Sequence, residues 1–311
     1  MRVTVTGGAG FIGANLCRTL LDTPSIEAVT VIDDLSSGRR RNLDGLEVRF
    51  VEGSILDRDA LDEATSGTEA IVHLAARPSV PRSIVDPVAS HLANATGTVE
   101  VLEAARRAGN ARVVVASSSS VYGANPTLPK HEDLTPMPVS PYAVSKLATE
   151  SYAIAYAHSY GLPTLAFRFF NVFGPLQAAG HAYAAVVPAF VAAALAGEPL
   201  PVHGDGRQSR DFTFVDTVAQ VITASLTEGV SSDRPVNLAF GTRTDLLTVI
   251  DRLRTIMGAE LPIEHLPTRP GDVRDSQADT TVLRTLFPQI VPVALDDGLR
   301  RTVDWMRTDV E

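Results

Sequence analysis

The sequence predicts an α/β fold: a doubly wound parallel sheet of the Rossmann type, with a smaller α/β domain after it. Short apolar runs alternate with segments of helical periodicity through the first half of the chain, and most of the runs are continuously apolar. Parallel strands that are covered on both faces show this pattern. After about residue 170 the spacing is irregular, and Gly and Pro are more frequent. We therefore expect a Rossmann domain over 1–170 and a smaller, ligand-binding domain over 171–311, with some chain returning to the first domain.

Six apolar runs are the expected strands of the sheet, and the segments between them are the expected helices. The strands are predicted at Val3–Val5, Ala28–Ile32, Val48–Val51, Ala70–Leu74, Arg112–Ala116 and Thr164–Phe167. Helical periodicity is clear at Phe11–Leu21 and Ala93–Ala108. Ligands of open α/β sheets bind beyond the carboxyl ends of the strands, so the smaller domain is expected to pack over that edge.

Composition and charge exclude several classes of function for the 311-residue chain. A net charge of -9 argues against binding to nucleic acid, and the basic run Arg39–Arg41 follows a turn and is interpreted as a solvated loop. No apolar run approaches the ~20 residues that span a bilayer. No signal peptide is visible. Cys17 is the only cysteine and lies in a helical pattern, which predicts a core residue and no cysteine-rich metal site. We expect a cytoplasmic protein without a metal.

A glycine-rich loop follows the first strand. The run T-G-G-A-G-F-I-G at 6–13 places glycines at the spacing of a dinucleotide-binding loop and opens a helix. The residues expected to contact the dinucleotide here are Gly7, Gly10, Phe11, Ile12 and Gly13. Such glycines let backbone amides approach a pyrophosphate at the helix N-terminus. Asp33 closes the second strand, where an acid hydrogen-bonds the adenosine ribose and repels a 2′-phosphate. The loop therefore predicts a dinucleotide site that prefers NAD to NADP, although either Asp33 or Asp34 could be a turn carboxylate.

A tyrosine and a lysine stand four residues apart at the start of a predicted helix. Ser140 is a good N-cap and Pro141 suits the first helical position. Tyr142 and Lys146 then share one helix face. The helix dipole and the lysine charge favour an ionised phenol, so we expect a lowered pKa for Tyr142 and a role as general base.

A run of four serines at 117–120 follows the fifth predicted strand. Alone, such a cluster is typical of a polar turn. Here it ends a central strand beside the expected cofactor site, and Tyr142 follows after one loop. A serine hydroxyl could orient a substrate hydroxyl while Tyr142 takes its proton, and hydride would pass to a nicotinamide. The three groups together predict an oxidoreductive step on a hydroxyl.

These motifs together resemble the extended short-chain dehydrogenase/reductase family. The runs R-F-F-N-V-F-G-P at 168–175 and G-D-G-R-Q-S-R-D-F at 204–212 narrow the resemblance to nucleotide-sugar epimerases and dehydratases. The resemblance implies Ser118, Tyr142 and Lys146 as catalytic residues. Tyr142 and Lys146 also contact NAD in this family, and the resemblance adds further NAD contacts at Asp57, Leu74, Ala75, Ala76 and Asn94. It implies substrate contacts at Ser118, Ser119, Asn171, Val187, Arg210, Arg269, Asp272 and Ser276.

The serine cluster also bears on the reaction. Related dehydratases carry Asp-Glu where this chain has Ser119 and Ser120, and UDP-glucuronate decarboxylases place a glutamate nearby. The resemblance is therefore to the 4-epimerases and implies reversible oxidation at C4 of a UDP-hexose. In this family, enzymes that accept only sugars without an acetamido group carry a bulky tyrosine at the position of Ser276. The resemblance therefore implies that UDP-N-acetyl sugars also fit. The alternative is that Ser276 only caps a turn.

Two alternatives stay open from the sequence. One is an enzyme of the same fold that acts on UDP-glucuronate or a deoxysugar nucleotide. The other is a non-catalytic, NAD-binding regulator, against which the intact Ser118, Tyr142 and Lys146 argue. By analogy with the family we expect a homodimer that forms through the helices near 92–108 and 142–160.

Overall fold

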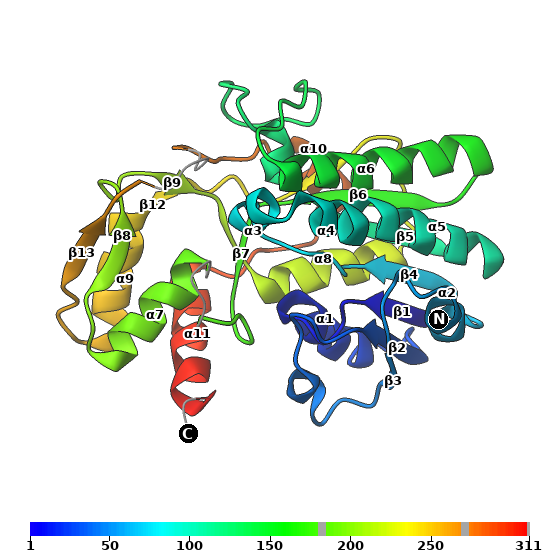
Figure 1. Cartoon of the computed structure of the whole chain (residues 1–311). Coiled ribbons are helices and arrows are strands. Elements are labelled where there is room, and N and C mark those ends of the chain that lie inside the picture. The colour runs from blue at the N-terminus through cyan, green and yellow to red at the C-terminus, as the bar shows by residue number, and fades with distance from the viewer. Residues whose placement is uncertain (180–184, 269–273, 310–311) are drawn as a thin grey trace.

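A seven-stranded parallel sheet forms the centre of the first domain, in the strand order β11-β6-β5-β4-β1-β2-β3 (Figure 1). This is a computed structural model, and it describes residues 1–179, 185–268 and 274–309. The strands are β1 (Arg2–Thr6), β2 (Ala28–Asp33), β3 (Arg49–Glu52), β4 (Ala70–His73), β5 (Arg112–Ser118), β6 (Thr164–Phe169) and β11 (Val236–Leu238). The predicted doubly wound fold is confirmed, and each of the six predicted strands is present within one or two residues of its expected bounds.

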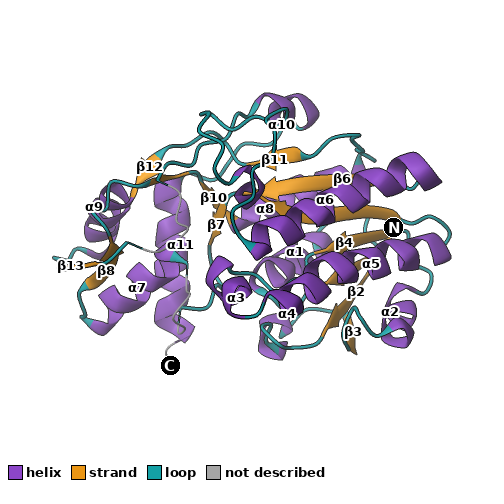
Figure 2. Cartoon of the chain, turned by 45° about the horizontal axis from the view of Figure 1, so that its top comes forward, coloured by secondary structure: helices purple, strands orange, loops and turns teal. Residues whose placement is uncertain are grey.

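Helices cover both faces of the sheet, as Figure 2 shows. One face packs against α1 (Phe11–Leu21) and α8 (Val215–Thr227), and their apolar side chains share a core with β1 and β6. The other face packs against α2 (Arg58–Thr65), α5 (Gly97–Arg107) and α6 (Pro141–Tyr160). The burial of strands on both faces explains why their sequences are continuously apolar. Shorter elements of this domain are α3 (Val80–Val85), α4 (Pro87–His91), a π-helical turn (Leu92–Thr96), α10 (Thr281–Leu286) and 3₁₀ turns at Arg40–Leu43 and Ser119–Tyr122.

The second half of the chain returns to the first domain through α8, β11 and α10. The short strand β11 pairs in parallel with β6, at Val236 opposite Phe167 and Leu238 opposite Phe169. The helix α8 packs along α1. The sheet that carries the site is therefore assembled from both sides of residue 170.

The second domain lies beside the carboxyl ends of the strands (Figure 1). Its core joins aromatic and aliphatic residues of three long helices and a two-stranded parallel sheet. These elements are α7 (Val186–Ala196), α9 (Leu246–Met257), α11 (Leu295–Asp309), β8 (Leu200–His203) and β13 (Ile263–Leu266). Two smaller strand pairs connect the domains: β7 (Asn171–Phe173) with β10 (Phe212–Phe214), and β9 (Ser209–Arg210) with β12 (Thr244–Asp245).

The fold bears on what the sequence indicated about membrane spans, Cys17 and metal ligands. Across the described ranges, no helix combines the length and apolarity that crossing a membrane requires. Cys17 is fully buried in α1, and burial raises the pKa of its thiol to about 12, as expected for a core residue. In the same ranges no three or more His, Cys, Asp or Glu side chains gather as metal ligands.

A buried histidine makes the stability of this domain depend on pH. His73 ends β4 and is hydrogen-bonded through Nδ1 to Thr6 Oγ1 (2.8 Å) and through Nε2 to Thr98 Oγ1 (3.2 Å). Burial, and secondarily the charge of Lys146, lowers the pKa of His73 to about 3. An unfolded histidine titrates near 6.5. Between these values the unfolded chain binds the extra proton, so this contribution to stability is lost as the pH falls.

We expect His73→Gln, which keeps a polar amide but does not titrate, to remove that contribution. Relative to this variant, the wild-type protein should lose about 2 kcal/mol of unfolding free energy between pH 6.5 and 5, at ~1.4 kcal/mol per pH unit. Urea unfolding of both proteins at pH 7.5, 6.5 and 5 measures the difference. If the unfolding free energies of the wild-type protein and His73→Gln change equally with pH, His73 is not the source of the pH dependence.

Candidate active site

The glycine loop between β1 and α1 has the geometry that a bound pyrophosphate requires. Gly7 has φ +71°, and a Cβ placed there would lie 2.6 Å from the backbone nitrogen of Ala75, so only glycine fits. The Gly10 amide donates to Gly7 O (3.1 Å) and closes the turn. Gly10 then caps α1 without any side-chain hydrogen bond. The first amides of α1, at Phe11, Ile12 and Gly13, are therefore left to an anion.

Asp33 holds this loop in place from the end of β2. Its carboxylate accepts hydrogen bonds from the amides of Ala9 and Leu35, both at 2.9 Å. Burial raises the pKa of Asp33, and the two amides oppose that effect. Asp34 bonds the amide and hydroxyl of Ser36, so both carboxylates accept from the amide two residues on, and Asp33 differs by its bond to Ala9 of the glycine loop.

The loop after β4 forms a wall that lies directly against the glycine loop at Gly7. Leu74, Ala75 and Ala76 follow His73, and the Ala75 amide donates to Thr6 Oγ1 (3.2 Å). Asn94 is buried in the π-helical turn, where its Oδ1 accepts from the Arg77 amide (2.7 Å) and its Nδ2 donates to Ser145 Oγ (2.9 Å). Asn94 thus connects this wall to α6. Asp57 caps α2 by accepting from the Asp59 and Ala60 amides, and this bonding occupies one of its oxygens.

The start of α6 is built as its sequence predicts. Ser140 is the N-cap, and its hydroxyl accepts from the Ala143 amide (3.2 Å). Pro141 begins the helix, and the Tyr142 amide donates to Ser83 Oγ of α3 (3.0 Å). The cap and this second contact fix the first turn, and with it the backbone of Tyr142.

Tyr142 and Ser118 meet where β5 ends. The Ser118 side chain is hydrogen-bonded to the Tyr142 phenol, and its hydroxyl also accepts from the Ser120 amide (3.2 Å). Burial of the phenol raises the pKa of Tyr142, and the bond with Ser118 partly offsets this. The expectation of a lowered pKa is therefore wrong, because burial of the phenol raises its pKa by more than the bond with Ser118 lowers it.

Lys146 stands one turn further along the same face. Its ammonium donates to the carbonyl of Ala116 on β5 (2.8 Å), and only 5% of the residue is exposed. Burial lowers the pKa of Lys146 to about 8, so the side chain remains mainly cationic at neutral pH. A cation fixed one turn from a phenol is suited to stabilise the phenolate, the form that can accept a proton.

Several of the residues expected to bind substrate lie at the junction with the second domain. Phe169 is paired with Ser118 across β5 and β6, so Asn171 follows just beyond Ser118. The Asn171 amide donates to Asp211 O (3.1 Å), next to Arg210. Ser209 O accepts from both the Ser276 amide (3.1 Å) and Arg210 Nη1 (2.8 Å). The structure thus brings Asn171, Arg210 and Ser276 together.

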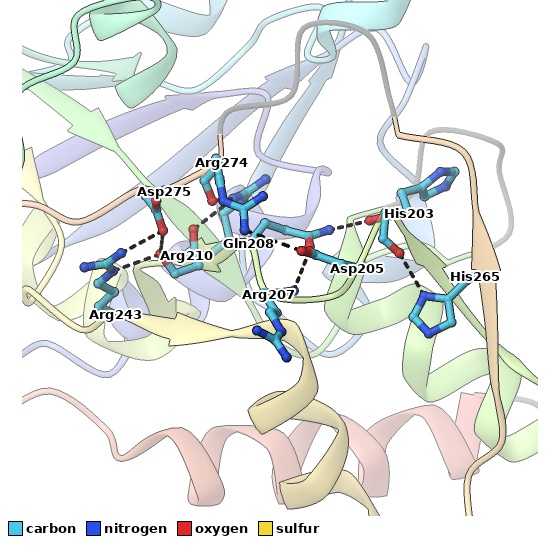
Figure 3. A network of polar contacts seen from close by, with 11 residues as sticks. His203, Asp205, Arg207, Gln208, Arg210, Arg243, His265, Arg274 and Asp275 are labelled. Carbon is cyan, nitrogen blue, oxygen red and sulfur yellow. Dashed lines mark hydrogen bonds and ion pairs between the residues drawn. The ribbon is translucent and has the colours of Figure 1, made fainter.

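Further arginines surround Arg210. Figure 3 shows Arg243 and Arg274 gathered with it around Asp275. Arg243 pairs with the Asp275 carboxylate (3.0 Å), and Arg274 pairs with Asp205 (3.4 Å). The side chains of Arg210, Arg243 and Arg274 make this cluster rich in guanidinium groups, which suit a diphosphate.

The comparisons with known proteins agree with this geometry. Residues 3–239 match the NAD dependent epimerase/dehydratase family. The chain belongs to this family. It is 39% identical to UDP-glucose 4-epimerase of Mycolicibacterium smegmatis, with 99% of each chain covered. It is 36% identical to dTDP-glucose 4,6-dehydratase of Streptomyces niveus, over 99% of this chain and 93% of the relative.

A solved structure extends the comparison to the fold. The UDP-N-acetylglucosamine 4-epimerase of Methanobrevibacter ruminantium, in complex with UDP-N-acetylmuramic acid, has a TM-score of 0.93 and 34% identity, covering 99% of this chain and 98% of that one. The resemblance drawn from the sequence is confirmed, as are NAD as the cofactor and an isomerase of the nucleotide-sugar 4-epimerase class. The glycine loop and the uncapped α1 fit NAD, because they offer close backbone approach and free amides.

Some of the residues expected to bind substrate in this epimerase/dehydratase are placed differently or lie outside the described ranges. Val187 lies in α7, and the whole residue is 1% exposed in the core of the second domain, so its side chain packs in that core. Ser119 opens the 3₁₀ turn beside Ser118, as its position in the sequence implies. Arg269 and Asp272 lie outside the described residues.

Sequence reasoning missed a buried polar group directly behind the site. Glu150 lies one turn beyond Lys146 on α6, and Arg168 on β6 pairs with it at 2.6 Å, each side chain being 3% exposed. Ser117 donates to the same carboxylate (2.7 Å). The spacing of Tyr142, Lys146 and Glu150, four residues each, was the available signal, since it places all three on one helix face.

Proposed function

We propose that the protein inverts the configuration at C4 of a UDP-hexose and interconverts UDP-glucose and UDP-galactose. The hydrogen-bonded pair of Ser118 and Tyr142, with the buried Lys146 cation one turn away, carries the proposal. A hydroxyl group, a phenol and a fixed cation at the carboxyl end of a central strand suit proton removal from a sugar hydroxyl. The family and the UDP-glucose 4-epimerase relative support the same reaction.

The residues of the chain divide the proton transfer between them. Ser118 hydrogen-bonds the C4 hydroxyl and aligns it with Tyr142, whose oxygen takes the proton. Bound NAD supplies the redox chemistry, by accepting the C4 hydrogen as hydride and returning it. Lys146 stabilises the phenolate of Tyr142 between turnovers. After the 4-keto sugar presents its other face, Tyr142 gives the proton back to the C4 oxygen, so the protein is unchanged over the cycle.

The residues after Ser118 favour epimerisation over loss of water. Eliminating water between C5 and C6 requires one group to remove a proton and another to protonate the leaving hydroxyl. Ser119 and Ser120 occupy the positions that the dehydratases fill with Asp and Glu, and a serine hydroxyl is neither a useful acid nor a useful base at neutral pH. The 4-keto sugar is therefore expected to be reduced again, not dehydrated.

A panel of nucleotide sugars tests the reaction. The NAD-loaded protein is incubated with UDP-glucose, UDP-N-acetylglucosamine, UDP-glucuronate or dTDP-glucose, and the couplings of H4 are followed by proton NMR. We expect the axial and equatorial C4 epimers of UDP-glucose to reach equilibrium. A 4-keto-6-deoxy product would indicate a dehydratase. Absence of any product with NAD bound would indicate the non-catalytic regulator.

Ser276 is proposed to leave room for an acetamido group at C2. Its backbone is fixed beside Arg210 through Ser209, and its side chain is small and half-buried. We expect Ser276→Tyr to lower kcat/KM for UDP-N-acetylglucosamine by about tenfold or more and to spare UDP-glucose, because one clash of this kind exceeds ~1.4 kcal/mol. Competition assays with both sugars measure the ratio. Unchanged activity on the acetylated sugar would show that Ser276 only stabilises a turn.

A homodimer is proposed from an exposed apolar face. Val88 on α4 is 66% exposed and Val144 on α6 is 53% exposed, and the two helices pack side by side. Further exposed apolar residues on α3, the π-helical turn and α6 are Ile84, Val85, Leu92 and Tyr152. Leu92, Val144 and Tyr152 lie within the segments 92–108 and 142–160 that are expected to pair, and exposed apolar residues there fit a second copy of the chain. We expect Val144→Asp to weaken the dimer in light scattering after gel filtration; an unchanged mass would place the interface elsewhere.

We also propose that the protein works in the cytoplasm, where a reduced thiol such as Cys17 is stable. Fractionation of the source cells with an antibody tests this. Recovery with the membrane or exported fraction would contradict it.

A further inference from the structure

Three consecutive residues of β5 hold α6 by three different groups. Ala116 accepts the ammonium proton of Lys146 through its carbonyl (2.8 Å). Ser117 donates through its hydroxyl toward Lys146 O (3.2 Å) and Glu150 Oε2 (2.7 Å). Ser118 is hydrogen-bonded to the phenol of Tyr142. The contacts of Ser117 involve no group that takes part in the proposed proton transfer. They lie between the contacts of Ala116 and Ser118, which hold Lys146 and Tyr142.

Glu150 is a firm anchor for Ser117 because Arg168 neutralises and orients it. Arg168 donates from Nη2 to Oε1 (2.6 Å) and from Nε to Oε2 (3.0 Å), a bidentate arrangement. The guanidinium also lies 4.7 Å from the centre of the Tyr122 ring and donates to the carbonyl of Glu132 (3.4 Å). With both side chains almost completely buried, this pair has a single geometry and links α6 to β6.

The spacing along α6 converts this anchor into a constraint on the site. Tyr142, Lys146 and Glu150 follow one another at four-residue intervals, so they lie along one stripe that faces β5. Holding the helix at Glu150, and at the main chain of Lys146, fixes how far the helix can rotate or slide against the strand. A small rotation would move the ammonium off Ala116 and the phenol off Ser118 together.

We propose that Ser117, Glu150 and Arg168 are positioning residues for the proposed proton transfer: they fix the register of α6 against β5, and with it the places of Lys146 and Tyr142. This inference rests on the proposed function of that pair. None of the three touches the substrate, because they lie behind the pair, between the sheet and α6. Their removal should therefore affect the chemical step more than substrate binding.

Ser117→Ala is the decisive variant, since it deletes one hydroxyl and leaves the Arg168–Glu150 pair intact. Thr164→Val is the matched control: Thr164 on β6 donates to Ala153 O of the same helix (3.0 Å), away from the catalytic turn. Both changes remove a buried hydroxyl that bonds a carbonyl of α6. Both should cost similar stability in urea unfolding, which accounts for any general loosening of the helix.

We expect Ser117→Ala to lower kcat about tenfold or more at nearly unchanged KM, because displacements of about an ångström can cost that much. Thr164→Val should retain kcat within about twofold. Equal kcat in both variants, or a loss in Ser117→Ala confined to KM, would overturn the proposal.

A second readout does not depend on turnover. The ionisation of Tyr142 is followed by NMR in NAD-loaded protein labelled at tyrosine Cζ, with the resonance assigned by its absence in Tyr142→Phe. Ser117→Ala should move the midpoint by about half a pH unit or more, and Thr164→Val should not. His73, whose charge couples to that of Lys146, titrates far below this range. If no sugar nucleotide turns over but the midpoint moves as expected, the positioning role stands while the proposed reaction fails; an unmoved midpoint overturns the positioning role.

Discussion

Tyr142→Phe is expected to lower kcat by between about 10² and 10⁴, the contribution typical of a general acid or base. The substitution removes only the hydroxyl that Ser118 contacts, and it keeps the ring that packs at the start of α6. The glycine loop and Asp33 are untouched, so NAD affinity should change by less than about threefold. The measurement pairs steady-state epimerisation of UDP-glucose with the NAD content of the purified variant.

A control on the same helix separates the loss of the base from a general effect on α6. Tyr160 ends α6, is 48% exposed and packs on Arg106, so Tyr160→Phe removes a hydroxyl far from the site. This variant should keep full activity. Near-normal activity in Tyr142→Phe would show that another group takes the proton, and the assignment of the pair would be wrong.

Arg168→Met is expected to destabilise the fold by about 3–5 kcal/mol, because it leaves the Glu150 carboxylate buried without its partner. Burial alone would lower the pKa of Arg168, yet the hydrogen bonds and charge of Glu150 raise it above its usual value. The native state thus depends on the charged pair. Urea unfolding at pH 7.5 measures the loss.

Two further variants distinguish a lost pair from a lost side chain. Arg168→Met combined with Glu150→Leu should recover at least half of the stability, because the uncompensated charge is gone. Arg234→Met breaks a pair with Asp133 whose side chains are 49% and 72% exposed, and it should cost less than about 1 kcal/mol. Equal losses in the two single variants would show that burial of the Arg168 pair carries no special penalty.

The parts of the site that the sequence predicted are those encoded locally. The glycine loop is recognisable because Gly7 has a backbone conformation and a close neighbour that exclude other residues. The start of α6 is recognisable because Ser140 and Pro141 have defined roles in a first helical turn. Such signals involve residues a few positions apart, so no knowledge of the fold is needed to interpret them.

The missed parts depend on neighbours that are distant in the sequence. The three-residue strand β11 has no periodicity of its own and exists because β6 offers an edge to pair with. The pKa of Tyr142 follows from burial, which the i to i+4 spacing with Lys146 does not reveal. Glu150 and Arg168 resemble surface charges until α6 and β6 are packed together.

The return of β11 and α8 to the first domain has a consequence for how the protein is made. While the ribosome has released only the first half, one edge of β6 has no neighbour and the face of α1 that α8 later covers is bare. The face of α1 stays open until Thr227, the end of α8, has emerged from the exit tunnel, and the edge of β6 stays open until Leu238 has emerged. A nascent chain stalled before α8 would offer an unpaired strand and an apolar helix to chaperones and to other nascent chains. The cofactor loop is thus translated first, but the sheet that supports it is completed late in synthesis.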